Sequence, residues 1–121
     1  MKNITIYSVA SCDTVTRVGY YNASLEYKGK FKYHSKKVED TTTNRCIIIG
    51  IIDSFKMLKE PCTVKVVTST LLGINKWKKN KKGINADLIT ELHQIAVEEG
   101  CILSFEVLEN EGKRMRELAT E

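Results

Sequence analysis

The sequence predicts an α/β domain with a mixed five-stranded sheet and helices available for both faces. Two observations predict it: the first third of the chain alternates apolar and polar residues with period two, whereas later segments carry apolar residues at helical spacing. Segments of the second kind are separated by short β-branched runs, which gives the order βββαβααβα. A chain of 121 residues is long enough for one core, so we expect a single domain over 1–121.

The first three strands are expected at about 3–9, 20–27 and 30–36. A β-branched run at 4–6 marks the first, and strict alternation marks the other two. Lys28 and Gly29 lie between the second and third runs and form the turn of an antiparallel hairpin with one face in water.

Helical spacing of Ile48, Ile51, Ile52 and Phe55, preceded by the capping residues at 41–44, predicts a helix at about 43–59 that ends before Pro61. Asn85 can cap a later helix, whose C-terminal signal is a glycine at position 100. The remaining expected elements are a strand at 62–68, helices at 70–79 and 86–99, a strand at 101–108 and a last helix at about 111–120.

Composition and charge restrict the function only weakly. Nineteen basic residues against 15 acidic ones give a net charge of +4, a mild bias toward polyanionic partners. The four cysteines and two histidines lack the spacing of a metal site. No apolar run is long enough for a secretion signal or a membrane span, so a cytoplasmic location is expected.

Several segments in the same order resemble the ribonuclease H family. They are GYY at 19–21, LEYKGK at 25–30, TTTNR at 41–45 with LKEPC at 58–62, VVTSTLLGINKW at 66–77 and ENEGKRMRELA at 109–119. The resemblance covers nearly the whole chain and implies the ribonuclease H-like fold. It also implies a connection to RNA/DNA hybrid, whose RNA strand the family's enzymes cut with two Mg²⁺ ions about 4 Å apart.

The resemblance places four metal-binding acids in such enzymes: at the ends of the first and fourth strands, in the first helix and in the last helix. Carried onto this sequence, these positions are Val9, Ile47, Ser69 and Arg116, and none is an acid. We therefore expect a degenerate active site with no catalytic residues, no metal site and no cofactor, although the family would use Mg²⁺. The expected function is a catalytically inactive domain that binds RNA/DNA hybrid or duplex without cutting it.

The resemblance and the basic residues suggest a nucleic-acid interface of Thr42, Thr43, Asn44, Lys76, Lys78, Lys79, Lys81, Lys82 and Arg116. Each group also has a simpler interpretation that involves no nucleic acid. The threonines and asparagine are simple caps, the lysines a solvated helix end, and Arg116 pairs with Glu117 or Glu121.

Two other functions remain open at this stage. The first is a protein-interaction or self-association module that uses the apolar surface of Val9 and Ile47, with a protein partner or a homo-oligomer. The second is a metal-dependent ribonuclease H with relocated acids, drawn from Asp13 and from Glu109 or Glu111. Asp53 lies six residues after Ile47 and is expected on a different face of the helix.

Overall fold

The computed structural model describes residues 1–70, 72 and 83–121. Its elements are β1 (Lys2–Cys12), β2 (Gly19–Tyr27), β3 (Lys30–Val38), α1 (Thr43–Phe55), β4 (Cys62–Thr68), α2 (Ala86–Glu98), β5 (Ile102–Val107) and α3 (Gly112–Ala119).

The five strands form one mixed sheet in the order β3-β2-β1-β4-β5, as the sequence predicted. β2 pairs antiparallel with both β1 and β3, and the expected turn at Lys28 and Gly29 has positive φ at both residues. β1 pairs parallel with β4, and β4 pairs parallel with β5. The parallel half therefore needs crossovers, and the helices between its strands supply them.

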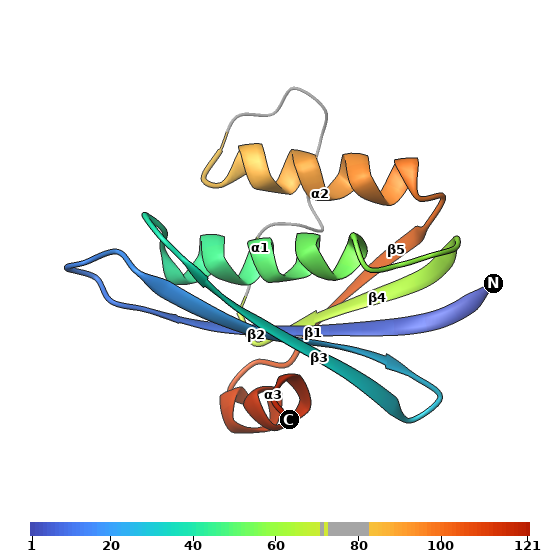
Figure 1. Ribbon diagram of the computed structural model, residues 1–121, viewed down its shortest axis with the longest axis horizontal. Coiled ribbons are helices and arrows are strands. Elements are labelled where there is room, and N and C mark those ends of the chain that lie inside the picture. Colours follow the sequence, from blue (N-terminus) through green and yellow to red (C-terminus); the bar gives the residue numbers. More distant parts are fainter. Residues whose placement is uncertain (71, 73–82) are drawn as a thin grey trace.

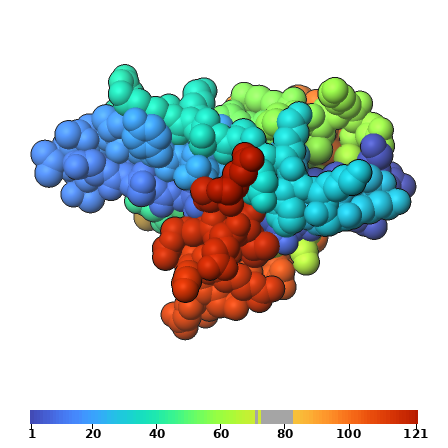
Figure 2. Space-filling model, turned by 60° about the horizontal axis from the view of Figure 1, so that its bottom comes forward, coloured from blue at the N-terminus to red at the C-terminus, as the bar shows by residue number. Residues whose placement is uncertain are grey.

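The helices lie on both faces of the sheet, which confirms the predicted layers. α1 and α2 stack over one face and α3 lies alone against the other (Figure 1). In Figure 2 the C-terminal segment, in red, stands out from the strands and covers only part of its face. Among the described residues, no helix is long and apolar enough to cross a bilayer.

Two predicted helices differ from the structure. α1 ends at Phe55 instead of residue 59, because the N–H groups of Met57 and Leu58 bond three residues back, to Ser54 and Phe55, in a tight turn. Met57 and Leu58 still pack against the core, and Leu58 lies three residues after Phe55, so its position in the sequence also fits a helical spacing. The helix expected at 70–79 lies almost entirely outside the described residues.

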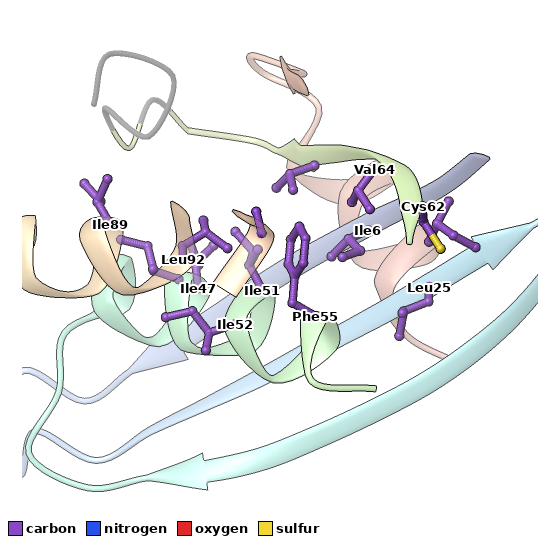
Figure 3. Packing of buried hydrophobic residues seen from close by; sticks show 14 residues of the cluster. Ile6, Leu25, Ile47, Ile51, Ile52, Phe55, Cys62, Val64, Ile89 and Leu92 are labelled. Atoms are coloured by element: carbon purple, nitrogen blue, oxygen red, sulfur yellow. The ribbon is translucent and has the colours of Figure 1, made fainter. Parts of the chain in front are cut away.

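α1 is apolar on nearly all sides because it lies between the sheet and α2. Figure 3 shows Phe55 of α1 beside Ile6 of β1, with Leu92 of α2 in the same group of buried side chains. All three side chains are fully buried. A helix that is hydrophobic all round is expected only where it is covered on all sides.

A polar network connects β2, β3 and the end of α1. The Tyr21 hydroxyl donates to Asp53 Oδ2 at 2.7 Å, and Ser54 Oγ donates to the carbonyl of Gly50 at 2.9 Å. His34 Nε2 lies 2.7 Å from Ser54 Oγ. Because Ser54 Oγ already donates its proton to the Gly50 carbonyl, Nε2 of His34 is the donor in the bond to Ser54 Oγ. Burial is the main cause that lowers the pKa of His34, and burial with the Asp53 carboxylate raises the pKa of Tyr21.

The His34 network predicts that the protein loses stability in mild acid. A lowered pKa in the folded state means that the unfolded chain binds the proton first, so this contribution is complete above about pH 6.5 and is lost as the pH falls through the folded-state pKa. Urea unfolding at pH 7.5, 6.5, 5.5 and 5.0 measures it. Between pH 6.5 and 5, the free energy of unfolding should change less with pH in His34→Gln than in the unmodified chain, because glutamine does not titrate. Equal pH dependence in the two proteins would contradict the assignment.

Candidate functional site

The N-terminus of α1 opens into a surface cavity, here called the α1 pocket. Its cavity volume is about 520 Å³, and it is lined by Cys12, Thr14, Arg17, Thr41, Thr42, Thr43, Asn44, Ile84 and Asn85. The predicted interface residues Thr42, Thr43 and Asn44 therefore lie together. Thr42 is also a true cap, since its hydroxyl accepts from the Arg45 N–H at 3.2 Å.

Arg17 is a cationic residue of the α1 pocket that sequence reasoning missed. It lies between β1 and β2, and its Nε donates to Asp40 Oδ1 at 2.9 Å. Its backbone carbonyl accepts from the N–H of Thr41, which brings this loop against the start of α1. No sequence pattern marks Arg17, because only the tertiary contact between two loops brings it to the pocket.

Arg45 joins the N-terminal ends of α1 and α2. Its two terminal nitrogens lie 3.0 and 2.9 Å from the two carboxylate oxygens of Asp87, and one of them also donates to Asn85 Oδ1. This paired hydrogen bond lowers the pKa of Asp87 to about 2. Asn85 begins α2 without a side-chain cap bond, contrary to its expected capping role, because its oxygen accepts from Arg45 instead.

A second cavity, here called the central pocket, collects the four positions that the family resemblance selected. Val9 comes from β1, Ile47 from α1, Ser69 from the end of β4 and Arg116 from α3. Ile47 is buried, Val9 and Ser69 are half-buried and Arg116 is exposed. Residues from four separate elements thus meet in one cavity of about 220 Å³.

The other walls of the central pocket are mostly small and polar. They are Ala10, Ser11, Asn22, Thr43, Thr70, Gly112 and Thr120. Thr43 lines both cavities, so the central pocket and the α1 pocket adjoin at the start of α1. Among the described residues that line the cavity, the polar side chains are hydroxyls, one amide and one guanidinium, and none is a carboxylate.

The acids considered as relocated ligands lie elsewhere. Asp13 accepts the N–H groups of Val15 and Thr16 in its own loop, and these bonds lower its pKa. Asp53 accepts from Tyr21, and Glu111 pairs with Arg114 at 3.4 Å. Residues 1–70, 72 and 83–121 contain no group of three or more His, Cys, Asp or Glu side chains placed to hold a metal ion.

Lysines at five predicted interface positions cannot be compared with the structure. Lys76, Lys78, Lys79, Lys81 and Lys82 lie outside the described residues.

Known proteins similar in sequence identify the family. A ribonuclease H of Campylobacter jejuni is 37% identical over 105 residues, which are 79% of this chain and 72% of the relative. This chain belongs to the ribonuclease H family. A ribonuclease H of Sulfurovum sp. is 40% identical over 96 residues, covering 72% of this chain and 65% of the relative. The matched part is 61% of a third relative, the ribonuclease H of Caldicellulosiruptor saccharolyticus. No protein-family model matches the chain.

Solved structures show the same fold. The N-terminal RNase H domain of a Mycobacterium tuberculosis protein has a TM-score of 0.75 at 13% identity and covers 98% of this chain and 91% of that domain's chain. The crystal structure of LC11-RNase H1 in complex with an RNA/DNA hybrid has a TM-score of 0.74 at 18% identity, with 95% and 92% covered. These matches confirm the predicted ribonuclease H-like architecture.

The expected loss of activity is contradicted by the relatives. Proteins 37% and 40% identical to this chain are named ribonuclease H, which is the name of an enzyme. The expectations of an inactive domain, of a non-enzyme and of no cofactor are corrected accordingly. They rested mainly on four residue positions, whereas the similarity extends over most of the chain.

The central pocket does not fit the Mg²⁺ ions of the family's chemistry. Mg²⁺ takes hard oxygen ligands and is usually held by one or two carboxylates, whereas this cavity offers hydroxyls, an amide and the positive Arg116.

Proposed function

We propose that this chain acts as a ribonuclease H on RNA/DNA hybrid. The observation that carries the proposal is the 37% identity to the Campylobacter jejuni ribonuclease H over 79% of this chain. The structural similarity to LC11-RNase H1, whose crystal structure contains an RNA/DNA hybrid, supports the same substrate. The chain spans only 65% of the length of the Sulfurovum relative. Ribonuclease H activity is therefore proposed for this chain and is not taken over from that relative.

The two adjoining cavities support hybrid as the ligand. The α1 pocket offers Thr42, Thr43, Asn44 and Arg17 around a helix N-terminus, where free N–H groups and the helix dipole favour an anion. The central pocket adds Arg116 on the other side of Thr43. In the proposal the two pockets hold phosphates of the hybrid, and the lysines at 76, 78, 79, 81 and 82 add to its electrostatic attraction.

The proposal predicts both hybrid binding and cutting of the RNA strand. A hybrid labelled at the RNA 5′ end is incubated with the full chain in Mg²⁺, in Mn²⁺ and in EDTA, and products are separated on denaturing gels. We expect RNA cleavage that depends on the divalent ion, with no cleavage of duplex DNA. Binding is measured on the same hybrid by filter retention at several salt concentrations, where affinity should fall with rising salt.

Asn44→Ala tests the α1 pocket in this assay. Asn44 is exposed and lines the pocket, so its loss should weaken hybrid binding without unfolding the chain. Gln94→Ala, an exposed amide of α2 outside both cavities, is the matched control and should bind as the unmodified chain does. Hybrid that is bound but never cut, with either ion, would refute the hydrolytic part of the proposal. Dissociation constants weaker than about 10⁻⁴ M for hybrid would refute all of it.

A further inference from the structure

The central pocket receives the N-terminal ends of two helices. Thr43 is the first residue of α1 and Gly112 is the first residue of α3, and both line the cavity. Neither helix has an acidic residue in its first turn. The first N–H groups of a helix have no partner within it, and its dipole places about half a positive charge at that end. Each of these helix ends therefore brings the positive end of its dipole to the cavity, although α3 also carries Glu111 at its N-cap position.

Arg116 adds a full positive charge to the same cavity. Its guanidinium turns back along α3, since Nη1 lies 3.7 Å from the point that a side-chain carbon on Gly112 would occupy. The guanidinium thus reaches the first turn of the helix. Across the described part of the chain Arg116 has no ion pair, so the expected pairing with Glu117 or Glu121 does not form.

Arg114, two residues earlier on α3, differs from Arg116 because it forms an ion pair. Its Nη1 lies 3.4 Å from Glu111 Oε1, and it does not line the cavity. One arginine of this helix therefore pairs with a carboxylate, whereas the other faces a cavity whose described lining residues include no carboxylate. A guanidinium presents a fork of N–H donors that matches two oxygens of a phosphate group.

The rest of the cavity suits an oxyanion as well. Ser11, Ser69 and Thr70 supply hydroxyls from the ends of strands, and Asn22 supplies an amide from β2. Val9 and Ile47 form an apolar side of the cavity. A cavity of about 220 Å³ is several times the roughly 30 Å³ that one water occupies in the liquid.

We propose that the central pocket binds a phosphate group of the nucleic acid directly, on Arg116 and the N-terminal N–H groups of α1 and α3. This inference rests on the proposed function in one respect: the phosphate is taken to belong to the backbone of an RNA/DNA hybrid. Inorganic phosphate carries oxygens like those of a backbone phosphate, so it can probe the central pocket in the absence of hybrid.

The first experiment titrates the ¹⁵N-labelled full chain with inorganic phosphate at constant ionic strength, with chloride as the balancing anion. We expect saturable shifts of the Thr43, Ser69 and Gly112 amides and of the Arg116 side-chain signal. Arg116→Gln should abolish these shifts, and Arg116→Lys should restore part of them because it keeps the charge without the fork. Arg114→Gln is the matched control and should titrate like the unmodified chain.

The second experiment measures hybrid affinity of the same variants at several salt concentrations. Arg116→Gln should weaken binding about tenfold and reduce the slope of log affinity against log salt by about one, as expected for one lost phosphate contact. Arg116 is exposed, so the variant should fold, and an unchanged amide spectrum away from the cavity verifies this.

The outcomes separate this inference from the proposed function. Phosphate shifts that persist in Arg116→Gln, fail to saturate or lie outside the cavity would overturn the inference, even if hybrid is still bound and cut. Saturable phosphate binding that needs Arg116, in a chain that binds no hybrid, would support the anion site and overturn the proposed function. Loss of both would overturn both.

Discussion

Replacing Phe55 with alanine is expected to lower the free energy of unfolding by about 3–5 kcal/mol. Phe55 is fully buried at the end of α1, among side chains of the sheet and of the neighbouring helix (Figure 3). The change removes an aromatic ring from a site closed on all sides, so it costs both the lost burial and the cavity that remains. Because a domain of this size is stable by only about 5–15 kcal/mol, much of its stability depends on this residue.

Urea unfolding at pH 7.5 and 25 °C, followed by circular dichroism, measures the effect. Val97→Ala on α2 is the matched control, because Val97 is 78% exposed and its truncation leaves no cavity. The control should change the free energy of unfolding by less than about 0.5 kcal/mol. A loss below about 1 kcal/mol in Phe55→Ala would contradict the described core.

Replacing Met115 with alanine is expected to cost about 2–5 kcal/mol and also to weaken hybrid binding. α3 has only eight residues, too few for a stable isolated helix in water, so it depends on its contacts with the sheet. Met115 is fully buried in that contact, and Ser24 Oγ of β2 donates to the Leu118 carbonyl at 2.7 Å. A loosened α3 would carry Gly112 and Arg116 away from the central pocket.

Amide hydrogen exchange resolved by residue measures this effect, together with urea unfolding and hybrid binding. Protection of the α3 amides should fall in Met115→Ala, whereas Lys113→Ala, an exposed change on the same helix, should leave it intact. Full protection of α3 in Met115→Ala would show that other contacts hold the helix. Normal hybrid affinity with a loosened α3 would argue against a role for this wall of the pocket.

The errors of the sequence reading have identifiable physical causes. Leu58 continues the apolar spacing of α1 although the chain has already turned, because it packs on the core without being helical. The capping role assigned to Asn85 was wrong because Arg45, distant in sequence, takes its oxygen. The inferred loss of activity was wrong because it rested mainly on four positions, whereas the identity to ribonuclease H proteins spans most of the chain.

The candidate site was predictable only in part. Val9, Ile47, Ser69 and Arg116 were selected through the family resemblance, and the structure places all four in one cavity. Arg17 and Gly112 were missed, since neither has a local pattern that indicates a pocket. Their positions depend on contacts between segments that are distant in sequence.

The sequence by itself determined the types and order of the described elements and the antiparallel hairpin, because hydrophobic period, capping and turn residues act over a few neighbouring positions. Only the tertiary structure decided which side chains share a cavity and which charges remain free. Arg114 and Arg116 are two residues apart on one helix, yet one pairs with Glu111 and the other faces the central pocket. That difference follows from the packing of α3 on the sheet, which orients each side chain toward a carboxylate or toward a cavity.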